Sequence, residues 1–169
     1  VVDLWGGTAN AKTEDPWLED TMCTVFSSTK GATALAAHML IASGELDLES
    51  PVKRYWPEFA KNGKESATVR MMLDHSVGVP CLREPVADGG AHDWEYMIDR
   101  LEAEEAFWKP GTRNGYHMIN FGWTVGELVR RVSGQSLGTF FREAIGEPTG
   151  AEFWIGLPSE LEQKVARVI

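Results

Sequence analysis

The chain has 169 residues, a net charge of −9 and an isoelectric point near 4.9. Hydrophobic residues make up 43% of it and charged residues 24%, with no repeat or low-complexity tract, so we expect one globular domain. The acidic balance argues against nucleic acid or an anionic membrane surface as a partner. No apolar run approaches the roughly 20 residues of a membrane-spanning helix, and no basic-then-apolar signal sequence opens the chain.

The first part of the chain is predicted to contain strands, at about 1–8 and at about 20–26. A helix is expected over about 28–43, where apolar residues recur at helical spacing until Gly44 stops it. These apolar residues are Ala32, Leu35, Ala36, Met39 and Leu40. Strands followed by helices indicate an α+β architecture.

The remainder of the chain is predicted to be mostly helical. A loop-rich stretch leads to a short helix around 67–75, and another helix is expected near 92–104. The second of these places one apolar stripe on a face, made of Trp94, Met97, Ile98 and Leu101. Acidic residues near its end are interpreted as a solvated face: Glu102, Glu104 and Glu105.

The tetrapeptide Ser27-Ser28-Thr29-Lys30 lies where the extended run gives way to the helix. A serine at this junction lies at the positive end of a helix dipole, and a lysine three residues later lies on the same face, within reach of its hydroxyl. The site must deprotonate the amine, which burial can achieve for lysine but not for arginine. Because S-x-x-K is common by chance, the tetrapeptide alone favours a helix cap and a solvated lysine.

Four segments together settle the interpretation of that tetrapeptide: residues 25–31, 44–52, 72–80 and 110–117. In this order they resemble the serine β-lactamase and penicillin-binding-protein superfamily, and most closely the class C-like esterases, the family VIII carboxylesterases. The resemblance covers nearly the whole chain. It implies the β-lactamase/transpeptidase-like fold, present here as a partial domain with strands at about 1–26, the nucleophile helix at about 28–43 and a helical region at about 44–169.

The resemblance also implies the site. Ser27 would be the nucleophile, Lys30 the base, and Tyr116 the family tyrosine that shares their proton, with no cofactor and no metal. The lactamase pattern Tyr-x-Asn becomes Tyr116-His117-Met118 here, and no Ser-Asp-Asn is present. Because Met118 cannot bond the amide of a β-lactam, a short-chain carboxylic ester is the expected substrate.

Two alternatives stay open beside the esterase. One is a β-lactamase or D-alanyl-D-alanine carboxypeptidase that uses the same residues. The other is a noncatalytic fragment or acyl-ligand binding module, because the resemblance indicates a chain that lacks the family's N-terminal start and its third, glycine-containing motif. That motif's strand supplies the second N–H of the oxyanion hole, the first being that of Ser27.

A competing nucleophile is Ser136, in Gly134-Gln135-Ser136-Leu137-Gly138, which fits G-x-S-x-G. The α/β-hydrolase elbow requires a strand before this serine and a histidine after it. The apolar spacing over 125–132 predicts a helix instead, and no histidine follows His117. We therefore expect Ser136 to be the N-cap of the next helix.

The histidines and cysteines give weaker signals. The four histidines are scattered without partners at ligand spacing, so no metal site is predicted; His75 is expected to tie a helix end to a turn, and His117 either lines the acyl pocket or is structural. Cys23 and Cys81 could form at most one disulfide. Because Cys23 lies in the apolar run, where a buried free thiol is the commoner state, we expect it to be buried and unpaired. This favours a reducing, cytoplasmic location. The oligomeric state is not predicted.

Overall fold

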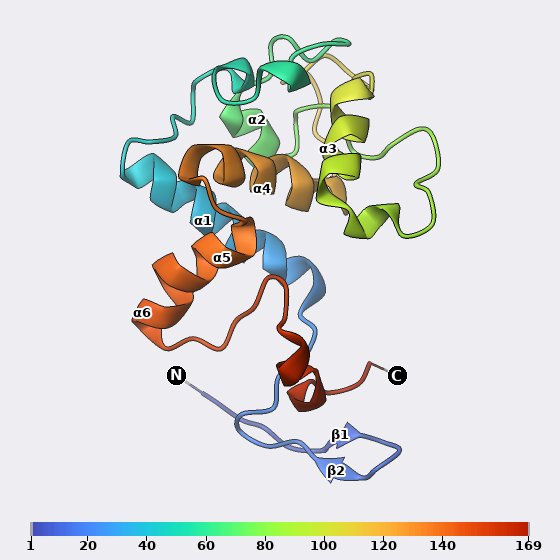
Figure 1. Ribbon diagram of the computed structural model, residues 1–169, viewed down its shortest axis with the longest axis vertical. Coiled ribbons are helices and arrows are strands. Elements are labelled where there is room, and N and C mark those ends of the chain that lie inside the picture. Colours follow the sequence, from blue (N-terminus) through green and yellow to red (C-terminus); the bar gives the residue numbers. More distant parts are fainter. Residues whose placement is uncertain (1, 169) are drawn as a thin grey trace.

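The computed structural model describes residues 2–168, as two short strands followed by a helical body (Figure 1). The strands and the α-helices, in chain order, are β1 (Thr8–Asn10), β2 (Asp15–Pro16), α1 (Thr29–Ala42), α2 (Val69–Leu73), α3 (Trp94–Ala103), α4 (Asn120–Ser133), α5 (Leu137–Phe141) and α6 (Glu147–Thr149). Between α5 and α6 one turn of π-helix spans Arg142–Gly146. Short 3-10 helices are Phe26–Ser28, Val52–Arg54, Pro57–Phe59, Gly90–His92 and Ser159–Lys164.

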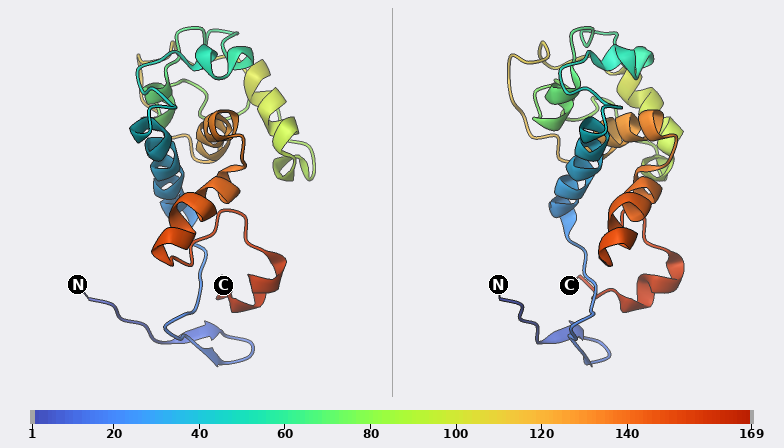
Figure 2. Two further views of the ribbon diagram at one scale, coloured as in Figure 1. Left: turned by 60° about the vertical axis from the view of Figure 1, so that its left-hand side comes forward. Right: turned by 90° about the vertical axis from the view of Figure 1, so that its left-hand side faces the viewer.

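Helices α1 and α4 cross at the centre of the helical body (Figures 1 and 2). The face that α1 buries carries small residues, Ala36 and Ala37, beside Leu40, and these allow α4 to pack closely. α4 contributes Val125, Leu128 and Val129 to the same core. α1 is apolar on its other side as well, where Leu35 and Met39 are exposed.

The expected helices are found close to their predicted positions. The helix predicted over about 28–43 is α1, and Gly44 follows it with φ of 82°, the left-handed conformation that ends a helix. The helix predicted near 92–104 is α3, whose N-cap Asp93 accepts a hydrogen bond from the Tyr96 N–H at 3.1 Å. α4 ends before Gly134, which has φ of 74°.

The strand predictions were less accurate. β1 and β2 form an antiparallel hairpin that pairs Thr8 with Pro16, so the opening strand begins only where the first predicted strand ends. The strand predicted at about 20–26 is not formed: only Met22 makes a β-bridge, parallel to Val165. The reason is that, within residues 2–168, no further strand lies beside this segment to complete a ladder. Cys23 is consequently exposed rather than buried, as is Cys81.

Two fully buried charged side chains join the helices. Glu127 of α4 accepts hydrogen bonds from Trp94 Nε1 at 2.8 Å, Arg130 Nε at 2.7 Å and Arg131 Nε at 2.7 Å. Burial alone would raise the pKa of Glu127, but the bonds from Arg130, Trp94 and Arg131 hold it below its ordinary value. The carboxylate is therefore ionised inside the core.

Lys64 is the second buried charge, and it caps the end of α3. Its Nζ donates to the backbone oxygen of Glu102 at 3.1 Å and to that of Glu104, where the helix dipole is negative. Burial, helped by Lys61, lowers the pKa of Lys64 to about 8. The carboxylate of Glu102 accepts from Trp56 Nε1 at 2.6 Å, and that of Glu104 accepts from the Arg83 N–H at 3.0 Å. The prediction of a solvated face was therefore wrong for Glu102 and Glu104, and Glu105 alone of the three is exposed.

Across residues 2–168, the longest helices fall short of the length and apolarity that a bilayer crossing demands. The hairpin lies apart from the helical body in all three views (Figures 1 and 2). It is joined to the rest through the C-terminal segment, where the Arg167 N–H donates to the Ala9 oxygen at 3.1 Å.

Candidate active site

Ser27 lies in the 3-10 turn that leads directly into α1, and its side chain is exposed. Phe26, just before it, has φ of 46°, an uncommon left-handed conformation for a bulky residue. Strained backbone of this kind concentrates at functional sites. The turn therefore presents the Ser27 hydroxyl at the N-terminal end of α1, as the sequence predicted.

Lys30 approaches the serine from the first turn of α1. Its Nζ donates to Ser27 Oγ at 3.2 Å and to the backbone oxygen of Met118 at 2.6 Å. The first contact is the one that a base needs in order to accept the serine proton. The second fixes the amine against a segment that lies 88 residues further along the chain.

Tyr116 completes the group. The Lys30 Nζ lies 4.8 Å from the centroid of the Tyr116 ring. Hydrogen bonding with Ser27, and then with Lys30, lowers the pKa of the Tyr116 hydroxyl below its ordinary value. The structure thus brings Ser27, Lys30 and Tyr116 together, and their catalytic roles remain predictions.

Backbone contacts hold the segment that carries Tyr116 against the end of α2. The Gly111 N–H donates to the Ser76 oxygen at 3.0 Å, and the Asn114 side-chain amide donates to the oxygen of Asp74. Gly115 fits tightly here, because a Cβ at this position would lie 2.5 Å from the Trp108 ring. A larger residue directly before the tyrosine would therefore have to displace the Trp108 ring.

His117 has a structural role in the folded chain. It is buried, its Nε2 accepts from the Val79 N–H at 3.1 Å, and its Nδ1 lies 2.6 Å from the Gly115 oxygen. Burial lowers the pKa of His117 to about 4, so the ring is neutral near neutral pH. Of the two roles open in the sequence, the contacts favour the structural one. His38 and His92 are exposed.

The competing serine is a helix cap. Ser136 precedes α5, and its Oγ accepts from the Thr139 N–H at 3.1 Å. No strand leads into it, because α4 runs to Ser133. The prediction that Ser136 is an N-cap is confirmed.

The backbone oxygen of Met118 contributes to the site but was not predicted from the sequence. Its side chain is 61% exposed, and only its carbonyl contacts Lys30. Any residue carries such a carbonyl, so no sequence signal could have identified it. Met118 is largely exposed at the position where the lactamase pattern has asparagine.

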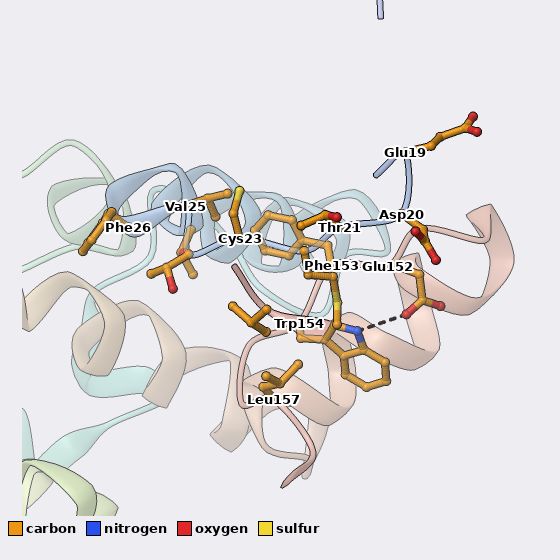
Figure 3. Close-up of a pocket in the computed structure, with 14 residues that line it drawn as sticks. Glu19, Asp20, Thr21, Cys23, Val25, Phe26, Glu152, Phe153, Trp154 and Leu157 are labelled. Atoms are coloured by element: carbon orange, nitrogen blue, oxygen red, sulfur yellow. Dashed lines mark hydrogen bonds between the residues drawn. The ribbon is translucent and has the colours of Figure 1, made fainter. Parts of the chain in front are cut away.

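A hollow of about 510 Å³ adjoins the nucleophile turn (Figure 3). Residues 19–26 form one side, and Phe153, Trp154 and Leu157 form the other, with Trp154 Nε1 donating to Glu152 Oε2 at 3.2 Å. Val25 and Phe26 reach it, whereas Ser27, Lys30 and Tyr116 do not line it. The hollow is therefore next to the site and is not the site itself.

A hydroxyl, an amine and a phenol in contact at the start of a helix form the arrangement of a serine acyl-transfer site of the S-x-x-K type. Comparison with known proteins supports this interpretation of the site. The sequence profile of the family described as Beta-lactamase matches residues 1–169. The chain therefore belongs to the β-lactamase family.

Individual relatives refine this assignment. The chain is 37% identical over 176 residues to the esterase/beta-lactamase LipL of Mycobacterium tuberculosis, and this match covers 100% of the chain and 39% of LipL. A crystal structure of a family VIII carboxylesterase superposes with a TM-score of 0.95 at 41% identity, over 100% of the chain and 47% of that protein. A penicillin-binding-protein homologue from Caulobacter crescentus has a TM-score of 0.93 at 36% identity, over 97% and 44%.

The relatives confirm the predicted family, with family VIII carboxylesterases among the most similar structures. The fold is the β-lactamase/transpeptidase fold, present in part and mostly helical with a small antiparallel sheet. The chain spans less than half the length of these relatives. Its relatives include esterases and other serine hydrolases of the β-lactamase family.

Proposed function

We propose that this chain carries the nucleophile and base of a serine hydrolase that cleaves short-chain carboxylic esters through an acyl-enzyme on Ser27. The observation that carries the proposal is the 3.2 Å contact between Lys30 Nζ and Ser27 Oγ, with the Tyr116 ring against the same amine. A nucleophile within hydrogen-bond reach of its base is the geometry of covalent catalysis.

The reaction proceeds by two displacements. Ser27 Oγ attacks the acyl carbon while its proton passes to the Lys30 and Tyr116 pair, and the negative charge develops on the carbonyl oxygen near the backbone N–H of Ser27. Collapse of the tetrahedral intermediate breaks the bond to the alcohol, which leaves with the proton. Water, deprotonated by the same pair, then attacks the acyl carbon. The bond between this carbon and Ser27 Oγ breaks, the pair returns the proton to Oγ, and the acid is released.

Met118 supports an ester over a lactam. A methionine side chain donates no hydrogen bond to the amide that flanks a β-lactam, and Met118 contributes to the site through its carbonyl, which accepts from Lys30 Nζ at 2.6 Å. A site that offers no hydrogen-bond partner for this amide gains little affinity from it, whereas the apolar acyl group of an ester needs no such partner. The names of the relatives, esterase and carboxylesterase, support the same choice.

A second candidate is a β-lactamase or D-alanyl-D-alanine carboxypeptidase on the same residues. The similarity to a penicillin-binding-protein homologue and the double description of LipL favour it. It predicts acylation of Ser27 by penicillins, whereas the ester proposal predicts weak or absent acylation by them.

The test is covalent modification by an alkyl fluorophosphonate, followed by intact mass and peptide mapping. We expect one adduct on Ser27, no adduct on Ser27→Ala, and release of p-nitrophenol from p-nitrophenyl acetate or butyrate. Nitrocefin should be turned over much more slowly than either ester. Absence of any adduct from the folded chain would overturn the proposal and favour a noncatalytic binding module.

A further inference from the structure

His75 follows the end of α2 and faces the segment that carries Tyr116. It adopts φ of 65°, a left-handed conformation that histidine enters more readily than most non-glycine residues. Its ring is half-buried. It lies 5.0 Å from the Tyr116 ring and 4.9 Å from the Phe121 ring, measured between centroids.

His75 accepts two hydrogen bonds from the chain, one on each side of Tyr116. The backbone oxygen of His75 accepts from the Gly115 N–H at 3.1 Å. Its side-chain Nδ1 accepts from the His117 N–H at 3.1 Å. The residues before and after the tyrosine are thereby fixed, while the histidine ring lies against the tyrosine ring.

We infer that His75 is a positioning residue for Tyr116, that its neutral ring is the working form, and that protonation of Nδ1 releases the segment that carries the tyrosine. This inference rests on the proposed function, because it assigns a task to the Tyr116 hydroxyl. A protonated Nδ1 becomes a donor and can no longer accept the His117 N–H. Two donors would then face each other, and the Tyr116 segment would move away.

The charges around His75 keep it neutral at ordinary pH. Burial, and then the positive charge of Lys30 on α1, lower the pKa of His75, whereas Asp74 on its own segment acts in the opposite direction. The other titratable groups that face it are Tyr116 and His117, whose ring lies 5.5 Å away. Whenever Lys30 carries its proton, including after it has accepted that of Ser27, the amine therefore helps to hold the positioning histidine unprotonated.

The chain allows a matched pair of variants. His75→Asn places an amide oxygen close to where Nδ1 stands, tolerates the left-handed conformation and does not titrate. His75→Phe keeps a ring beside Tyr116 and removes the acceptor. Two quantities are measured from pH 4.5 to 7.5: the rate at which an ethoxy fluorophosphonate modifies Ser27, and the hydrogen-exchange protection factor of the His117 amide.

At pH 7.5 we expect His75→Asn to stay within about threefold of the wild type in both quantities, and His75→Phe to lose about fivefold to tenfold, the equivalent of one hydrogen bond. At pH 4.5 the wild type should lose a similar factor relative to His75→Asn. Equal wild-type and His75→Asn protection factors throughout this range would overturn the inference.

The design separates the possible failures. If His75→Phe does not fold, the comparison of wild type with His75→Asn still decides, because it depends only on pH. If Ser27 is never modified in any variant, the proposed function fails while the His117 amide still reports whether His75 holds the segment. If the protection factors change as expected but the modification rates follow the same pH profile, His75 is structural and the positioning role is wrong.

Discussion

Glu127 offers the most demanding test of how the helical body is held together. We consider Glu127→Ala, which removes a fully buried carboxylate that accepts hydrogen bonds from Trp94, Arg130 and Arg131. Breaking a buried ion pair by removing one partner costs about 3–5 kcal/mol, and an unpaired buried N–H alone costs about 1–3 kcal/mol.

The other contacts of the two arginines place the expected value near the lower end of that range. Arg130 also contacts Glu95 at 3.3 Å, and Arg131 contacts Glu58 at 2.7 Å, so neither guanidinium would be left alone. We expect a loss of about 3 kcal/mol in the free energy of unfolding, a large part of the 5–15 kcal/mol typical of a domain.

The assay is urea unfolding followed by tryptophan fluorescence and far-UV circular dichroism. Glu58→Ala is the matched control, because it removes an exposed carboxylate from the same Arg131, and exposed ion pairs contribute roughly 0–1 kcal/mol. The reasoning is refuted if Glu127→Ala loses less than about 1 kcal/mol, or no more than Glu58→Ala.

Three further predictions concern the site and the buried lysine. Ser136→Ala should lower stability by about 1 kcal/mol, as loss of a helix cap does, and leave fluorophosphonate modification of Ser27 unchanged; an adduct on Ser136 would contradict its role. Lys30→Ala, Tyr116→Phe and the double variant should each slow acylation by a similar large factor, whereas multiplicative losses would mean that the two act independently. The pKa of Lys64 is about 8 in the folded chain, against an ordinary 10.4, so between these values the unfolded chain binds a proton that the folded chain has lost. The free energy of unfolding should therefore rise with pH across this window, by up to about 3 kcal/mol relative to Lys64→Met. Parallel pH profiles of the wild type and Lys64→Met would contradict this.

The sequence predicted local structure well, because helical spacing and caps are local properties. Gly44 and Gly134 end α1 and α4 where expected, and the i, i+3 spacing puts Lys30 within reach of Ser27, although the resemblance was needed to interpret the pair as a site. Tyr116 was found only through the resemblance, since no periodicity connects it with Ser27. What brings it there is the packing of residues 110–118 against the end of α2.

The remaining features depend on contacts between distant parts of the chain. A strand at 20–26 needs a neighbouring strand, and residues 2–168 give it only the single bridge from Met22 to Val165. Lys64 and Glu127 are charged residues, yet both are buried: the end of α3 satisfies Lys64, and Trp94 of α3 bonds Glu127 together with Arg130 and Arg131 of its own helix. His75 was expected to tie a helix end to a turn, but the hydrogen bonds that it accepts from Gly115 and His117 could not be derived from its neighbours in sequence.

The separation of the hairpin from the helical body divides the molecule into two zones of different local stability. A two-stranded hairpin is marginal by itself, so its amides should exchange through small openings, whereas those of α1 and α4 should exchange only on global unfolding. The turn that carries Ser27 lies on the boundary between these zones. A ligand that contacts residues 20–26 would therefore add its binding free energy to every opening that disrupts its site, and protection would rise with ligand concentration in this segment and, through global unfolding, in α4 as well.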